Sequence, residues 1–333
     1  MAVRQRNIIL RFASALLPAV AGVLVVVSLF AGYLVHLVTH PKRMPEEVTP
    51  QQYSVLTGSS IAWSEEQWAN NDGTRAIGWL LRAQPGAPAI ILNHGYGHNR
   101  SQLLDLGVKL RDAGYHVLLP DLRGHGLSPV KWTSLGDYEA DDLLAAVTFL
   151  KEMKGGHGQP LVDQARIGVY GVSLGGYAAL AAAYRDPTIC TVIADGAYRN
   201  PGILTRSLMG EMFSNAGTEL DGFLRIGLKC YFFGKYEKVS LEEAVGKLSV
   251  QKVWFVTSNS SNVFDRSMKD LFALSSGQKE LVTVDHSRAS RLEGADQAAY
   301  DDHMVSYFRR ALPREAAQPL GSETRAAVTR GTP

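Results

Sequence analysis

Apolar residues follow two different patterns along this chain. Residues 12–35 form a run of 24 positions without a charge, whereas later positions alternate short β-rich runs with longer helical stretches. A helix that crosses a membrane needs roughly 20 predominantly apolar residues, so the first pattern predicts one transmembrane helix. A cleaved secretory signal is the alternative, although its apolar region usually covers only about 7–15 residues.

The charges that flank this run predict its orientation. Arg4, Arg6 and Arg11 precede it, and Lys42 and Arg43 follow it. Because basic residues are enriched on the cytoplasmic side of a membrane, this distribution favours a cytoplasmic N-terminus. We therefore predict a membrane anchor over residues 1–43 and expect the rest of the chain to fold on the periplasmic or extracellular side.

Short β-rich runs set the pattern of the globular part. Two of them flank Asp72-Gly73 and predict a β-hairpin, because glycine supplies the positive φ of a tight turn. Six more runs alternate with helical stretches and predict a mostly parallel sheet covered by helices on both faces. These six runs are residues 89–92, 116–119, 167–170, 192–194, 253–257 and 281–284.

One long segment interrupts the alternation. Residues 199–246 have a mostly helical pattern rich in Leu, Met, Phe and Tyr, which predicts a cap insertion within a domain of residues 60–312. Residues 44–59, which contain Pro and Glu, are expected to form a linker. The polar residues 313–333 are expected to form a disordered tail.

Composition and charge narrow the class of protein. The chain has 333 residues, of which 46% are hydrophobic and 20% charged, as in a globular protein. Acidic residues slightly outnumber basic ones after position 43, which argues against nucleic acid as a partner. The two cysteines, Cys190 and Cys230, lack the spacing of metal ligands, so no structural zinc site is expected. The sequence implies no metal or organic cofactor. Whether the two cysteines form a disulfide is left open.

The sequence Gly171-Val-Ser-Leu-Gly175 matches G-x-S-x-G and falls between a predicted strand and an Ala-rich helical stretch. Glycines flank Ser173 because so sharp a turn brings neighbouring backbone too close for larger side chains. The turn would hold the Ser173 hydroxyl at a helix N-terminus, where developing negative charge is favoured. We therefore predict that Ser173 is a nucleophile.

A second loop can supply donors for an oxyanion. His94-Gly-Tyr-Gly97 follows the first parallel run, the place from which such a donor is expected. The backbone N–H groups of Tyr96 and Leu174 are predicted to bind the oxygen of a tetrahedral intermediate. His94 is expected to support the loop through a hydrogen bond.

Asp121-Leu-Arg-Gly-His-Gly-Leu-Ser128 follows the second parallel run. With the two preceding motifs in this order, the sequence resembles the α/β-hydrolase family over about residues 60–312, in particular its serine aminopeptidase and monoacylglycerol lipase-like branch. The resemblance implies that Asp121, Arg123 and His125 brace loops beside the site. It also implies a catalytic histidine after the last strand, which matches His286.

The third member of the predicted triad departs from the family pattern. Ser260 occupies the position where the resemblance places an acid, and a triad carboxylate normally fixes the tautomer of the histidine. Asp195, after the strand of residues 192–194, and Asp265, at the start of the next helix, are the two possible replacements. The third possibility is that the chain has no acid. His303 lies within an amphipathic helix and is expected at the surface or the edge of the core.

These features predict a membrane-anchored serine hydrolase that cleaves a carboxylic ester, or else a thioester or amide, of a small acyl substrate. Apolar cap positions such as Leu204, Leu208 and Met212 favour a lipid-like acyl group, although such stripes are more often core. One alternative is a membrane-tethered binding protein that kept the fold and lost the acid. A peptidase acting on short peptides is a second alternative.

Overall fold

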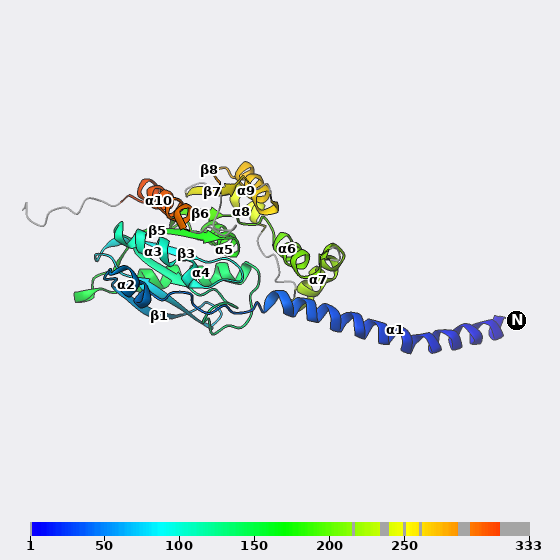
Figure 1. Ribbon diagram of the computed structural model, residues 1–333. Helices are drawn as coiled ribbons and strands as arrows, with labels where there is room; N and C mark the ends of the chain where they lie inside the picture. The colour runs from blue at the N-terminus through cyan, green and yellow to red at the C-terminus, as the bar shows by residue number, and fades with distance from the viewer. Residues whose placement is uncertain are drawn as a thin grey trace, which may run out of the picture.

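The computed structural model describes residues 2–214, 217–233, 240–248, 251–259, 262–285 and 294–313. At its centre lies an eight-stranded sheet with the strand order β1-β2-β4-β3-β5-β6-β7-β8 (Figure 1). The strands are β1 (Trp63–Ala69), β2 (Arg75–Leu81), β3 (Ala87–Asn93), β4 (His116–Pro120), β5 (Val162–Val172), β6 (Ile189–Asp195), β7 (Lys252–Ser258) and β8 (Gln278–Val284).

The sheet is antiparallel at one edge and parallel elsewhere. Strands β1 and β2 form a hairpin, and Gly73 in its turn has a φ of 81°. Strand β2 also pairs antiparallel with β4, whereas the pairs from β4 to β8 are all parallel. The predicted hairpin and the mostly parallel sheet are confirmed, and each of the six predicted runs lies within a strand.

Helices cover both faces of the sheet. One face carries α3 (Leu104–Asp112) and α10 (Gly294–Ala311), which pack against each other. The other face carries a row of four helices (Figure 1). These are α4 (Asp137–Glu152), α5 (Leu174–Arg185), α8 (Leu241–Gly246) and α9 (Val263–Leu274). Two short 3-10 helices, η1 (Arg100–Leu103) and η2 (Gly156–Gly158), lie in connections.

Two further helices, α6 (Pro201–Phe213) and α7 (Gly217–Tyr231), lie between β6 and α8 in the chain, within the segment predicted to be a cap insertion. They pack against each other, and the buried Asp221 carboxylate on α7 accepts a hydrogen bond of 2.9 Å from Thr205 on α6. The segment that interrupts the strand and helix alternation is therefore helical within the residues described there.

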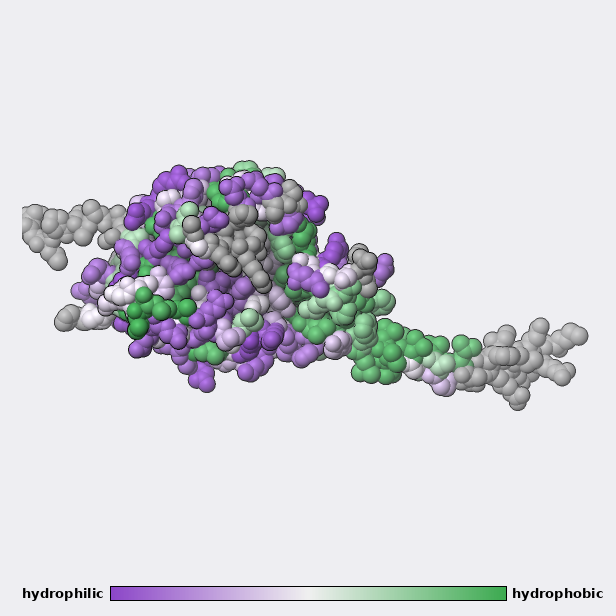
Figure 2. Space-filling model, viewed as in Figure 1, coloured by the Kyte–Doolittle hydropathy of each residue, from purple (hydrophilic) through white to green (hydrophobic). Residues whose placement is uncertain are grey.

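The N-terminal helix α1 (Ala2–Thr39) extends away from the rest of the molecule (Figure 1). Within it, Leu16–Thr39 is long and apolar enough to cross a membrane, a property that membrane anchors and signal sequences share. Large apolar side chains from Leu16 to Phe30 are exposed, and they form a continuous hydrophobic surface (Figure 2). Leu34, Val35 and Val38 are instead buried against the globular part.

The segment predicted to be a linker contains a short helix, α2 (Pro50–Thr57). The Thr49 side chain accepts from the backbone N–H of Gln52, and the Gln52 side chain accepts from the backbone N–H of Thr49. This capping box, with proline at the first helical position, explains why so polar a segment is helical. The Arg43 guanidinium, just before it, donates to the backbone oxygens of Gly126, Ser128 and Val130, so the chain is fixed to the domain where α1 ends.

Candidate active site

Ser173 lies at the turn between β5 and α5, at the edge where the parallel strands end. Its φ of 50° and ψ of −107° are unusual for a residue other than glycine, and strain of this kind clusters at functional sites. The backbone N–H of Ser173 donates to the backbone oxygen of Asp195 at 2.8 Å, which ties the turn to the end of β6. The side chain is half-buried.

Two glycines permit this turn. A Cβ atom at Gly171 would lie 2.1 Å from the backbone oxygen of Gly175, and a Cβ atom at Gly175 would lie 2.4 Å from the backbone oxygen of Asn93. Both distances are too short for a larger residue. The second contact also shows that the turn packs against the end of β3, from which the second predicted loop starts.

His94 braces that loop. Its buried ring contacts the backbone oxygen of Gly95 through Nδ1 at 2.8 Å, and its Nε2 accepts from the N–H of Leu122 at 3.0 Å. Burial lowers the pKa of His94 to about 3, so the imidazole is neutral and carries its proton on Nδ1. The expectation that His94 supports the loop agrees with these contacts.

Tyr96 connects the loop to the N-terminal helix. Its hydroxyl donates to the backbone oxygen of Val38 at 2.9 Å, and its ring packs edge-on against His125. Burial raises the pKa of Tyr96, so the hydroxyl remains a donor. Leu174, the other residue predicted to bind an oxyanion, is the first residue of α5, where helix N–H groups lack intrahelical partners. The residues around Tyr96 in the sequence do not predict its contact with α1, because Val38 lies 58 positions away.

The loop after β4 is held by buried polar contacts. The Asp121 carboxylate accepts from the N–H groups of Arg100 and Leu127, each at 2.9 Å. Arg123 forms a bidentate pair with Asp142. His125 contacts the backbone oxygen of Arg123 at 2.8 Å, and burial lowers its pKa to about 3. These contacts agree with the supporting roles that the resemblance implies for this loop.

Asp195 lies fully buried at the end of β6, beside the turn that carries Ser173. Its Oδ2 atom accepts from the hydroxyl of Tyr300 at 2.7 Å and, weakly, from that of Tyr170 at 3.4 Å. Burial and then the charge of Asp195 raise the pKa of Tyr300, which keeps that hydroxyl protonated as a donor. Sequence patterns did not single out either tyrosine as part of the site.

Asp265, the other replacement acid, is buried in the first turn of α9. Its carboxylate accepts from the Thr257 hydroxyl at 3.0 Å and from the Ser258 N–H and hydroxyl at 2.6 and 2.8 Å. Both carboxylate oxygens therefore hold the start of α9 against the end of β7, so this side chain stabilises the fold.

The predicted base, His286, and the position of Ser260 lie outside the described residues. The strand that precedes His286, β8, is present, and the Asp285 carboxylate after it accepts from Asn259 at 3.2 Å. Because β8 is a parallel neighbour of β7 and β7 of β6, the chain enters the segment of His286 at the same edge of the sheet as Ser173.

The other candidate residues lie on β6, α7 and α10. Cys190 and Cys230 are free thiols, and the exposed His303 contacts the Tyr307 hydroxyl. Among the residues that the structure describes, no group of three or more His, Cys, Asp and Glu side chains is placed to hold a metal ion.

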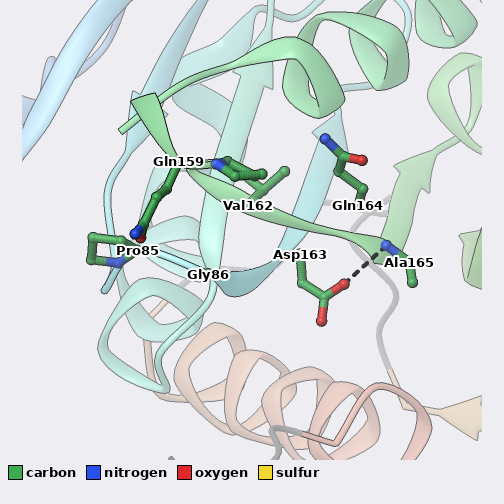
Figure 3. Close-up of a pocket in the computed structure, with 8 residues that line it drawn as sticks. Pro85, Gly86, Gln159, Val162, Asp163, Gln164 and Ala165 are labelled. Atoms are coloured by element: carbon green, nitrogen blue, oxygen red, sulfur yellow. Dashed lines mark hydrogen bonds between the residues drawn. The ribbon is translucent and has the colours of Figure 1, made fainter. Parts of the chain in front are cut away.

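An open surface depression of about 540 Å³ lies elsewhere on the sheet (Figure 3). It is lined by residues such as Pro85, Gln159 and Asp163, whose carboxylate accepts from the N–H of Ala165. These residues precede or begin β3 and β5, whereas Ser173 follows the end of β5. The depression is therefore separate from the candidate site.

A parallel sheet, a serine on a strained turn from strand to helix and a glycine-containing loop beside it define the hydrolase class of α/β proteins. Residues 88–225 match the family model described as the alpha/beta hydrolase fold. The chain thus has the α/β-hydrolase fold, as the sequence predicted.

Relatives and solved structures agree with this fold. A polyketide transferase from a Penicillium species is 32% identical over 142 residues, which cover 42% of this chain and 46% of the relative. A thiohydrolase from Aspergillus aculeatus is 30% identical over 135 residues, covering 40% of this chain and 41% of the relative. The chain spans about half the length of these curated relatives. An esterase structure from Pyrococcus furiosus aligns with a TM-score of 0.63 at 19% identity, covering 83% of this chain and 98% of that one.

Proposed function

We propose that this protein is a membrane-anchored serine hydrolase that cleaves a carboxylic ester through an acyl-enzyme. The observation that carries the proposal is the backbone at Ser173, which adopts a positive φ at the end of a parallel strand and at the start of a helix. Such strain persists only where the surrounding structure enforces it, and here it would present a hydroxyl at the edge where ligands bind.

In the proposed reaction, the Ser173 hydroxyl attacks the acyl carbon while His286 accepts its proton. The N–H groups of Tyr96 and Leu174 hold the oxygen of the tetrahedral intermediate, each donor being worth roughly 2.7–4 kcal/mol in comparable sites. His286 then protonates the leaving alcohol. A water molecule, deprotonated by His286, releases the acyl group and regenerates the Ser173 hydroxyl.

For the acid, we propose Asp195 over Asp265. Asp195 lies beside the Ser173 turn, and its carboxylate accepts hydrogen bonds from two tyrosine hydroxyls. A carboxylate has about four lone-pair sites, so these bonds do not exclude an imidazole. The Asp265 carboxylate is instead directed to the end of β7 by three hydrogen bonds.

Similar proteins with a described activity support an ester or a thioester as the substrate. The Pyrococcus furiosus structure is described as an esterase, and the Aspergillus aculeatus relative as a thiohydrolase. We therefore propose an oxygen ester as the substrate, with a thioester as the variant to test beside it. The Asp121–Ser128 loop supports placing the chain near the serine aminopeptidase and monoacylglycerol lipase-like branch.

The anchor is also a proposal. The exposed apolar surface of α1 has the length and composition of a transmembrane helix, and the arginines before it favour an exported domain. Fusing a reporter that is active only outside the cytoplasm to the C-terminus tests the orientation. An active reporter is expected, and an inactive but intact fusion would reverse the assignment.

A fluorophosphonate probe tests the enzymatic proposal. The folded protein should become labelled, and the labelling should disappear in Ser173→Ala while the folded state is retained. Labelling that persists in Ser173→Ala would place the nucleophile elsewhere.

A second candidate is a membrane-tethered binding protein without catalytic activity. It is favoured by the observation that both Asp195 and Asp265 accept hydrogen bonds from groups other than a histidine. No labelling of the folded wild-type protein by the probe would support this candidate over the hydrolase.

A further inference from the structure

The outer face of α7 exposes large apolar residues between Glu219 and Lys229, although the inner face already supplies the core contacts. Leu224 and Leu228 are fully buried on the inner face. Phe223 and Ile226 on the outer face are 51% and 66% exposed, and Phe233, just after the helix, is 91% exposed. A helix on the surface of a soluble protein normally presents polar residues outward. We therefore expect the exposed apolar residues of this face to contact another protein or a membrane.

Helix α7 packs directly against α1. A Cβ atom at Gly227 would lie 2.8 Å from the Val35 side chain and 3.5 Å from the backbone oxygen of Ala31. Glycine therefore allows the two helices to approach closely, and the contact fixes the level of α7 along α1.

The length of α1 places that level relative to a bilayer. Arg11 is the last charged residue before the apolar run, and a hydrocarbon core about 30 Å thick takes roughly 20 helical residues at 1.5 Å each. A stretch of that length from Phe12 ends at Ala31, which is where α7 makes contact. The exposed Tyr33 ring follows, and aromatic rings of this kind are enriched at the interface.

The apolar surfaces of the two helices are also continuous. Figure 2 shows the hydrophobic surface of α1 passing into the hydrophobic surface of the cap helices without a polar break. A bilayer that surrounds α1 up to Ala31 would therefore meet the outer face of α7.

We propose that the outer face of α7 is a second membrane-docking surface, with Phe223, Ile226 and Phe233 inserted at the boundary between headgroups and acyl chains. This inference rests on the proposed function in taking α1 as a transmembrane anchor. It deepens that function, because a cap held at the bilayer favours a substrate that is itself dissolved in the membrane.

Site-specific labelling of the full-length protein in vesicles of phosphatidylcholine and phosphatidylglycerol tests the proposal. Cys190→Ser removes one native thiol, and serine can keep its contact with the backbone oxygen of Ala165. A polarity-sensitive fluorophore is then attached to the exposed Cys230 on α7. In a background that also carries Cys230→Ser, Ile226→Cys provides a second site on the outer face.

Two further label positions are matched controls in this cysteine-free background. Val25→Cys reports on the exposed part of α1, and Leu274→Cys labels an exposed apolar residue at the end of α9. In Figure 1, α9 lies away from α1.

Nitroxide lipids should quench the labels at Val25→Cys, Ile226→Cys and Cys230 and spare the label at Leu274→Cys. If the label at Val25→Cys is quenched but the label at either α7 site is not, the docking surface is wrong and the proposal that α1 is a membrane anchor is retained. Lack of quenching at Val25→Cys would refute the anchor and the docking surface together. Shielding of the α7 sites from a water-soluble quencher, without quenching by lipid, would indicate a second copy of the chain and would also overturn the proposal.

Activity gives an independent readout. The double variant Phe223→Glu/Ile226→Glu should hydrolyse a long-chain ester embedded in vesicles roughly tenfold more slowly, because charged residues oppose insertion. Its rate on a water-soluble short-chain ester should stay unchanged, as should both rates of Leu274→Glu. Equal losses on both esters would overturn the proposal, whereas absence of hydrolysis by the wild-type protein would count against the proposed function alone.

Discussion

At the scale of single residues, Ser173 adopts a strained backbone conformation that its neighbours stabilise. A non-glycine residue at positive φ costs about 1–3 kcal/mol, so its neighbours must stabilise the turn. The hydrogen bond from the Ser173 N–H to the backbone of Asp195 and the close packing of Gly175 on Asn93 provide that stabilisation.

We predict that Gly175→Ala destabilises the protein by about 1–3 kcal/mol, because the new Cβ atom would force the Ser173 turn away from Asn93. Denaturant unfolding measures the change. Gly210→Ala on α6 is the control, since nothing lies within 4 Å of its Cβ position and alanine favours a helix by up to about 1 kcal/mol. Equal effects of the two substitutions would contradict the packing argument.

Asp195→Asn should lower kcat by about 10⁴-fold, by analogy with the loss of a triad carboxylate, while the protein remains folded. Steady-state kinetics on an ester substrate, with circular dichroism to verify folding, measure this effect. Asp265→Asn should mainly lower the unfolding temperature, because its carboxylate holds the end of β7. A larger loss of kcat in Asp265→Asn than in Asp195→Asn would exchange the two roles.

The sequence predicts the nucleophile Ser173 more firmly than it predicts the acid Asp195. The position of Ser173 follows from local spacing, because the strand, the glycines and the helix are adjacent in the chain. The environment of Asp195 depends on Tyr300, which lies 105 positions away and reaches it through the packing of α10. Local sequence patterns carry no information on such a contact. The sequence therefore leaves Asp195, Asp265 and the absence of an acid as alternatives and does not choose among them.

At the scale of elements, the end of α1 contacts a loop of the candidate site. The backbone oxygen of Val38 accepts from Tyr96 in the predicted oxyanion loop, and that of Thr39 accepts from the N–H of Thr133 at 2.8 Å. The apolar pattern predicts the helix over this segment, but it does not show that the last turn docks on the domain.

Tyr96→Phe removes the contact between the loop and α1 without changing the size of the ring. It should cost about 0.5–1.5 kcal/mol of stability and increase hydrogen exchange at residues 94–98. Hydrogen-exchange mass spectrometry and denaturant unfolding measure the two effects. Tyr33→Phe is the matched control, since that side chain is exposed on α1. Unchanged exchange at residues 94–98 would show that Val38 does not position the loop.

At the scale of the whole molecule, buried histidines couple folding to pH. The pKa values of His94 and His125 are about 3 in the folded protein, whereas an unfolded histidine titrates near 6.5. As the pH falls through 6.5, the unfolded chain therefore binds protons that the folded protein excludes. The stability is fully present above the unfolded pKa and is lost progressively toward the folded pKa.

We predict that the unfolding free energy falls between pH 7 and pH 5 with a slope approaching about 1.4 kcal/mol per pH unit for each of these histidines. Urea unfolding at a series of pH values measures the slope. His125→Gln should reduce the slope contributed by this pair. An identical slope in His125→Gln would show that His125 is not excluded from protonation.

We predict that the last turns of α1 contribute to the stability of the domain. A chain that begins at Ala31 keeps the docked residues Leu34, Val35 and Val38 and should unfold at the same urea concentration as the full chain in the same detergent. A chain that begins at His40 loses these three side chains, each worth about 1.5–3 kcal/mol when fully buried. It also loses the acceptors for Tyr96 and Thr133. We expect its midpoint to be clearly lower, because the last turns of α1 act as part of the domain. Equal midpoints for the two truncated chains would show instead that the domain is complete without α1.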